Sequence, residues 1–214
     1  MIEKLYKYKF ELLILLILIT IFIVSNPFRD YSWSADHDLL ILDKSLKLGF
    51  QSINYEHTGL LTFVIYKIFL IFASVISEIN SNYNNFLEGL DVNKVNSHTV
   101  YLRFINLLII FQILIFLNKI LMRILDDVII CFLITIIVLF SKPILGFVYE
   151  IRTDTTAIFL YLFALYIFIS KYNYSWLLSL LLSLSYITKI NIIPLVFTFP
   201  ILKNLIKKNN LKNI

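Results

Sequence analysis

The chain has 214 residues, of which 59% are hydrophobic, 16% aromatic and only 15% charged, and its mean hydropathy is +0.84. A soluble globular domain carries about a quarter charged residues, so this composition excludes an ordinary soluble domain and predicts a membrane protein. The net charge of +5 does not indicate nucleic-acid binding, because lysines at the ends of membrane spans give the same excess. The single cysteine excludes a disulfide framework and a thiolate metal cluster.

Seven apolar stretches are candidates for helices that cross a membrane, which takes about 20 apolar residues. The first follows a basic segment and is followed by Ser25 to Arg29 rather than by small residues, which favours an uncleaved span over a signal peptide. The second carries Lys67 near its middle, which is typical of a helix that lies at the membrane interface. The seven stretches are Phe10–Val24, Gly59–Ile79, Val100–Ile120, Val128–Phe147, Thr155–Ser170, Tyr174–Ile187 and Ile190–Ile206.

Six crossings, without the interfacial stretch, satisfy the positive-inside rule. They place both termini and most lysines in the cytoplasm, whereas a seventh crossing moves the basic tail outside. The sequence therefore predicts one all-α membrane domain, a polytopic bundle of about six spans. It comprises a first span at 10–24, an outer loop at 25–98 with juxtamembrane helices, five further spans over 100–206, and a basic tail at 207–214.

The outer loop carries two clusters of ionisable residues. Apolar spacing predicts an amphipathic helix from Ala35 to Leu48, with Asp36 and Asp38 in its first turn. These acids fit either a site or the ordinary preference of carboxylates for a helix N-terminus. The pair Glu56 and His57 precedes the interfacial stretch, where a helix cap is the alternative to a site.

Two further polar clusters interrupt the apolar chain on the predicted outer face. The first runs from Glu150 to Asp154, and Thr153 or Asp154 is a candidate N-cap for the next helix. The second is Thr188-Lys189, between two predicted spans, where a lysine is costly without a partner. Polar clusters that meet at one membrane face predict a site for an anionic, membrane-borne substrate.

The order of these motifs resembles the GT-C superfamily of polyprenyl-phosphate-sugar-dependent glycosyltransferases, over nearly the whole chain. The protein O-mannosyltransferase, aminoarabinose transferase and rhizobial lipopolysaccharide transferase groups are the most similar. The sequence differs from the family pattern at Thr58 and Thr153, where proline is usual, and family members usually have twice this length. The motifs are Asp36-His37-Asp38, Tyr55-Glu56-His57-Thr58-Gly59, Tyr101-Leu102-Arg103-Phe104, Tyr149-Glu150-Ile151-Arg152-Thr153-Asp154 and Leu184-Ser185-Tyr186-Ile187-Thr188-Lys189.

The resemblance implies a transferase that moves a sugar from a polyprenyl-phosphate donor to a glycan, glycolipid or protein acceptor. It further implies a bacterial inner membrane, with the site on the extracytoplasmic face. Asp36 is then the catalytic base and Asp38 orients the acceptor or binds a divalent cation; no other cofactor, no metal ligand set and no nucleic acid is expected.

The remaining roles follow from the same resemblance. Glu56 and His57 shape the acceptor side, while Arg152 and Lys189 hold the lipid phosphate and Asp154 positions Arg152. Two other functions stay open. One is a truncated, non-catalytic subunit or scaffold, and the other is a small transporter, which the clustering of charges at the predicted outer boundary disfavours.

Overall fold

The computed structural model describes residues 2–25, 42, 45, 59–76, 92–125, 127–170, 175–189, 195 and 198–201. All regular elements within these residues are helices, which confirms the predicted all-α class. They are α1 (Ile2–Val24), α3 (Leu60–Ile76), α5 (Val92–Leu125), α6 (Val128–Leu139), α7 (Lys142–Tyr149), α8 (Thr153–Ile169) and α9 (Ser175–Thr188).

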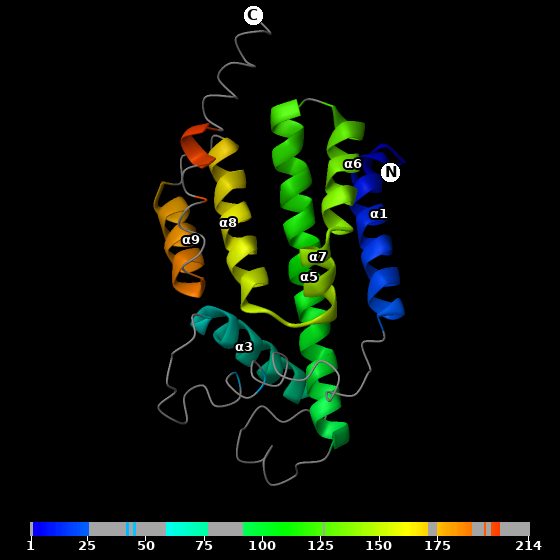
Figure 1. Cartoon of the computed structure of the whole chain (residues 1–214), viewed down its shortest axis with the longest axis vertical. Coiled ribbons are helices and arrows are strands. Elements are labelled where there is room, and N and C mark those ends of the chain that lie inside the picture. Colours follow the sequence, from blue (N-terminus) through cyan, green and yellow to red (C-terminus); the bar gives the residue numbers. More distant parts are fainter. Residues whose placement is uncertain are drawn as a thin grey trace, which may run out of the picture.

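Most helices run along the long axis of the molecule, and α3 lies across one end of them (Figure 1). This end, called the α3 end below, holds the ends of α1 and α9 and the starts of α5 and α8. The sequence predicts that the apolar stretch containing Lys67 lies at a membrane interface; in the structure this stretch forms α3, which lies crosswise to the other helices (Figure 1). Burial lowers the pKa of the Lys67 ammonium, since a low-dielectric environment disfavours the charged form.

The central helix of the bundle is α5, which contributes to all three apolar clusters of the described residues. One cluster joins α5 to α3 through Leu102, Tyr66 and Ile151. A second joins α5 to α1, α6 and α7, and the third packs α8 against α9 beside Ile120 of α5. The long helix therefore fixes the positions of the shorter helices around it.

The predicted span Val128–Phe147 is divided by the structure into α6 and α7, whose axes differ by 66°. The break falls at Phe140 and Ser141, just before Pro143. A proline within a helix has no N–H to donate, and its ring clashes with the carbonyl four residues earlier. Proline is tolerated in the first turn of a new helix, and this is its place in α7.

Among the described residues, one helix is long and apolar enough to cross a membrane by length and composition, the part of α5 from His98 to Leu125. The bent pair of α6 and α7 also passes if it counts as one span, whereas α3, α8 and α9 are apolar but shorter. The whole of α5 has 34 residues, which gives a length of about 51 Å at 1.5 Å per residue. That is longer than the roughly 30 Å of a bilayer's hydrocarbon core.

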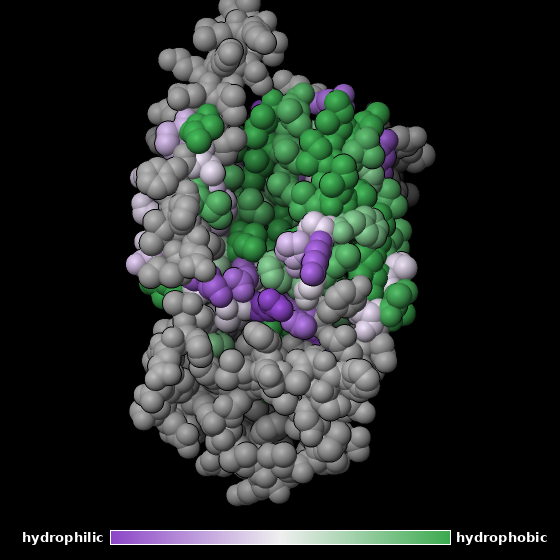
Figure 2. All heavy atoms as spheres, viewed as in Figure 1, coloured by the Kyte–Doolittle hydropathy of each residue, from purple (hydrophilic) through white to green (hydrophobic). Residues whose placement is uncertain are grey.

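Large apolar side chains are exposed on several helices. Figure 2 shows a broad hydrophobic surface on the face in view, bordered toward the α3 end by a hydrophilic band. The most exposed apolar residues lie on α1, α3, α6 and α9, including Val24, Val75, Ile137 and Trp176. Contiguous apolar surface of this kind is uncommon on soluble monomers.

Candidate functional site

An extended segment of three residues, Glu150-Ile151-Arg152, connects α7 to α8 at the α3 end. Glu150 and Arg152 have extended backbone angles, with φ near −132° and −137°. Alternate side chains of an extended chain point to opposite sides, so Ile151 is fully buried while Glu150 and Arg152 share the other side. The Arg152 Nε and Nη2 atoms donate to Glu150 Oε2, over 3.1 and 2.6 Å.

The second ion pair of the site joins α8 to the end of α9. Lys189 Nζ lies 3.2 Å from Asp154 Oδ1 and 3.4 Å from Oδ2. Asp154 sits in the first turn of α8 and Lys189 directly follows α9. A helix N-terminus favours an anion and a C-terminus favours a cation, so both groups occupy positions that the helix dipoles stabilise.

These pairings correct two expectations. Asp154 does not position Arg152, because Arg152 is held by Glu150 and Asp154 is held by Lys189. Neither Thr153 nor Asp154 caps α8, since both lie inside its first turn and Arg152 occupies the N-cap position without a side-chain cap bond. Thr155 makes a local bond instead, donating to the Arg152 carbonyl over 2.6 Å.

Asn106 of α5 is buried and connects four parts of the site. Its Nδ2 donates to the carbonyl oxygens of Phe147 (2.6 Å) and Glu150 (3.3 Å). Its Oδ1 accepts from Thr155 Oγ1 (2.8 Å) and from the Tyr66 hydroxyl of α3 (3.3 Å). This side chain therefore fixes both ends of the segment that carries Glu150 and Arg152. Asn106 lies within the predicted span Val100–Ile120 and was not among the predicted site residues, although an amide within an apolar span is a recognisable signal of such a role.

Gly59, the last residue of the motif Tyr55–Gly59, lies against the start of α8. Its φ of +147° lies in a region that residues with a Cβ rarely adopt. A Cβ added here would lie 2.6 Å from Thr153 Cγ2 and 3.3 Å from Phe63 Cζ. Glycine is therefore required by both the backbone angle and the close approach, and the contact fixes the start of α3 beside Thr153.

Further polar residues are buried on α5 near the α3 end. Arg103 and His98 are 2% and 1% exposed, and both are engaged in polar or electrostatic interactions. A charged guanidinium is buried only at high cost unless it is paired. Arg103 belongs to the Tyr101–Phe104 motif, so this motif also lies in the polar part of α5.

Four of the predicted site residues, Asp36, Asp38, Glu56 and His57, lie outside the described residues. Of the predicted helix Ala35–Leu48, the structure describes Leu42 and Ser45, which are both helical and buried. Leu42 belongs to the apolar cluster of α3 and α5. Leu42 therefore packs at the same end of the bundle as Ile151, the neighbour of Arg152.

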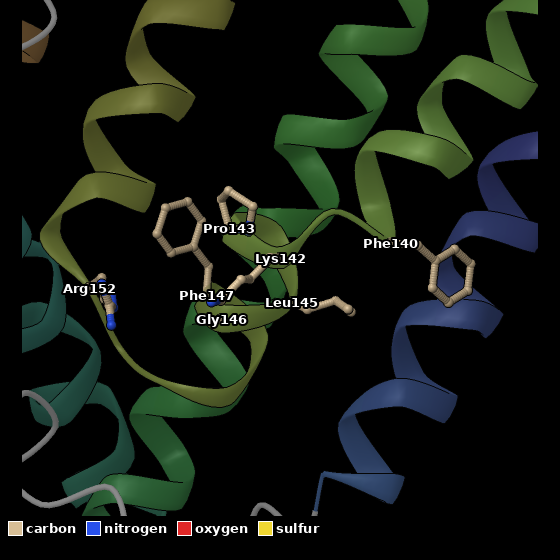
Figure 3. Close-up of a pocket in the computed structure, with 7 residues that line it drawn as sticks. All are labelled: Phe140, Lys142, Pro143, Leu145, Gly146, Phe147 and Arg152. Atoms are coloured by element: carbon tan, nitrogen blue, oxygen red, sulfur yellow. The ribbon is translucent and has the colours of Figure 1, made fainter.

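A pocket of about 530 Å³ adjoins the site at the bend between α6 and α7. Figure 3 shows Arg152 on one side of it and Phe140, near α1, on the other, with α7 between them. The pocket carries two cationic side chains, Lys142 and Arg152, on an otherwise apolar lining formed by Phe140, Pro143, Leu145, Gly146 and Phe147. Within the part of the chain that the structure describes, no three histidine, cysteine, aspartate or glutamate residues are grouped to hold a metal ion.

The arrangement can bind an anion. Arg152 and Lys189 offer a planar guanidinium and a compact ammonium, which are the usual partners of phosphate oxygens.

Comparisons with family models, with curated proteins and with solved structures found no match for this chain.

Proposed function

We propose that the protein is an integral membrane glycosyltransferase that moves a sugar from a polyprenyl-phosphate donor to an extracytoplasmic acceptor. The observation that carries the proposal is the meeting of separate motifs at one end of the bundle. Asp154, from the motif that also carries Arg152, contacts Lys189 of another motif over 3.2 Å, and Gly59 of a third lies against Thr153. Segments that are far apart in sequence thus supply two cations to one surface.

The membrane part of the proposal is a bundle of about six spans in a bacterial inner membrane. It is supported by the exposed apolar side chains of α1, α6 and α9 and by the length of α5. The distribution of cations supports the orientation, because Lys119 and Arg123 near the end of α5 lie at the opposite end from Arg152. Basic residues of short loops favour the cytoplasm, which puts the α3 end outside.

In the proposed mechanism, Asp36 accepts the proton of the attacking acceptor hydroxyl, and Asp38 orients the acceptor. Arg152 and Lys189 stabilise the negative charge of the departing lipid phosphate, which is the charge that grows as the glycosidic bond breaks. Glu56 and His57, which directly precede Thr58 and Gly59, shape the acceptor side. A divalent cation at the acidic residues is compatible with this scheme and is not required by it.

The test is transfer of a labelled sugar from a polyprenyl-phosphate donor in membranes that contain the wild type or a variant. Asp36→Asn is expected to abolish transfer, and Arg152→Ala is expected to raise the apparent KM for the donor. Arg123→Ala is the matched control, because it removes an exposed arginine at the opposite end. Equal rates of transfer by the wild type and by Asp36→Asn would contradict the role of Asp36 as the catalytic base.

Transport is a second candidate, which one observation favours. Discontinuous helices are typical of transporter substrate sites, and the predicted span Val128–Phe147 is discontinuous at Phe140. A transporter binds its substrate near the midplane of the membrane. Lys142 at the bend, rather than Asp36, is then the charge that transport requires. Uptake of a lipid-linked sugar by sealed vesicles without any transfer would support this candidate. A non-catalytic subunit is expected to show neither uptake nor transfer in these assays.

A further inference from the structure

The pocket at the bend of α6 and α7 has the form of a site for an amphipathic ligand. Its volume of about 530 Å³ falls within the usual range for small-ligand sites. Its apolar lining comes from the end of α6 and from one side of α7, and its charged groups are both cations. A ligand that matches this lining has an anionic head and a hydrocarbon part.

Lys142 is an unusual cation in its place. It is the first residue of α7, where the partial positive charge of the helix N-terminus disfavours a lysine. It is exposed, and it forms no ion pair with any residue that the structure describes. Figure 2 shows a small hydrophilic patch within the hydrophobic face, where Figure 1 draws α7. An ammonium group in such surroundings is stabilised by an anion.

Arg152 has donors left for the same anion. Of the five N–H donors of its guanidinium, the Glu150 carboxylate occupies two. The side chain is 38% exposed and lines the pocket together with Lys142. A phosphate group has enough oxygen atoms to accept bonds from both cations at once.

Gly146 keeps the pocket open. A Cβ atom built on Gly146 has no neighbour within 4 Å, so no packing requirement explains a glycine inside α7. Glycine weakens a helix interior relative to alanine, and its position in the pocket lining preserves space for a ligand.

We infer that this pocket binds an anionic lipid phosphate, with Lys142 and Arg152 on the phosphate and the apolar lining on the first carbons of the chain. The inference rests on the proposed function for the identity of the lipid as a polyprenyl phosphate. It adds Lys142 and Gly146 to the site.

The experiment measures equilibrium binding of farnesyl phosphate to the purified full chain in a neutral detergent. Farnesol and inorganic phosphate are the two halves of this probe, and each is expected to bind at least roughly tenfold more weakly than the whole. Lys142→Gln is expected to weaken binding about tenfold through loss of a charge-assisted contact. Arg123→Gln removes the same charge from the opposite end and is expected to change nothing.

Gly146→Leu is a second variant, designed to fill the pocket. A Cβ at Gly146 meets nothing within 4 Å, so the variant is expected to fold, as an unchanged unfolding temperature would verify, and to exclude farnesyl phosphate. Binding that is unchanged in both Lys142→Gln and Gly146→Leu overturns the inference. Inorganic phosphate that binds as tightly as the whole probe also overturns it, because the apolar lining then plays no part.

A short-chain phosphatidylglycerol in the same assay identifies the source of the lipid phosphate. Weaker competition than farnesyl phosphate supports the polyprenyl donor, and equal competition identifies a membrane phospholipid as the ligand. Transfer activity separates the two proposals. If transfer is absent but binding depends on Lys142, the proposed function fails and the pocket stands; if transfer occurs and is insensitive to both variants, the pocket fails and the function stands.

Discussion

At the scale of single residues, Asn106 has the largest influence on the geometry of the candidate site. It is one of few buried amides, and each of its polar atoms has two partners. Replacing it by leucine retains the approximate volume but leaves two carbonyl oxygens and two hydroxyl groups without this partner. A buried polar group that loses its partner costs about 1–3 kcal/mol.

We therefore expect Asn106→Leu to lower the thermal unfolding temperature in detergent and to abolish sugar transfer. Asn118→Leu is the matched control, because Asn118 is also buried on α5 but accepts one long bond of 3.4 Å from Thr135. Thr135 keeps its bond to the Cys131 carbonyl, so this control is expected to lose less stability and to retain transfer. Equal effects of the two variants on transfer would show that Asn106 has no special role.

Glu150 competes with any phosphate for Arg152. Both side chains are about one third exposed, so their ion pair contributes little to stability and can exchange partners. Glu150→Gln removes the negative charge but keeps a hydrogen-bond acceptor. We expect it to tighten binding of a lipid phosphate several-fold, because it removes the anion that competes for Arg152. The unfolding temperature is expected to change little.

The control for Glu150→Gln is Glu11→Gln, which breaks the 3.2 Å ion pair with Lys119, away from the α3 end. Its binding of lipid phosphate is expected to match the wild type. Weaker binding in Glu150→Gln would instead mean that Glu150 is needed to orient Arg152.

At the scale of helices, the contact between α3 and α8 depends on Gly59. Alanine at this position meets Thr153 Cγ2 at 2.6 Å and must also adopt a φ of +147°. Non-glycine residues in such conformations cost on the order of 1–3 kcal/mol before any clash is counted. We expect Gly59→Ala to lower the unfolding temperature and the rate of transfer together.

A double variant separates the two causes. Thr153→Ser removes the methyl group that the new Cβ meets, so Gly59→Ala with Thr153→Ser is expected to recover the part of the loss due to the clash. The cost of the backbone angle remains. Gly146→Ala serves as control for the unfolding temperature alone, because its Cβ meets nothing within 4 Å and its helix gains stability. No recovery in the double variant would contradict the contact between Gly59 and Thr153.

The helices themselves could be predicted from the sequence, because long apolar runs bounded by charged and polar residues form few other structures. The bounds of α8 and α9 lie within two residues of the predicted Thr155–Ser170 and Tyr174–Ile187. The bend between α6 and α7 was missed, since Pro143 stands in a run whose hydrophobicity continues across it. Hydrophobicity reports burial or contact with lipid, and the backbone direction depends on the single residue that cannot donate a hydrogen bond.

The candidate site was predictable in its charges but not in its pairings. Arg152 and Asp154 are two residues apart, as are Arg152 and Glu150, and sequence spacing does not distinguish the two pairs. The helix begins between them, so Glu150 shares an extended segment with Arg152 while Asp154 turns toward α9. Side chains two apart face each other along an extended chain but not around a helix.

At the scale of the whole molecule, the proposal requires the α3 end and the opposite end to lie on different sides of a membrane. The chain has one cysteine, Cys131, so Cys131→Ser provides a background for single new cysteines. Ser25→Cys lies just after α1 at the α3 end, and Arg123→Cys lies in the last turn of α5 at the other end. Both substitutions are at partly or fully exposed positions.

In intact cells, a membrane-impermeant maleimide is expected to label the cysteine at position 25 and not the one at position 123. Detergent should make position 123 reactive, which controls for its accessibility. The reason is that basic residues at short cytoplasmic turns are retained on that side, and Arg123 and Lys119 are such residues. Labelling of both positions, or of position 123 alone, in intact cells would contradict the orientation and, with it, an extracytoplasmic site at Arg152 and Lys189.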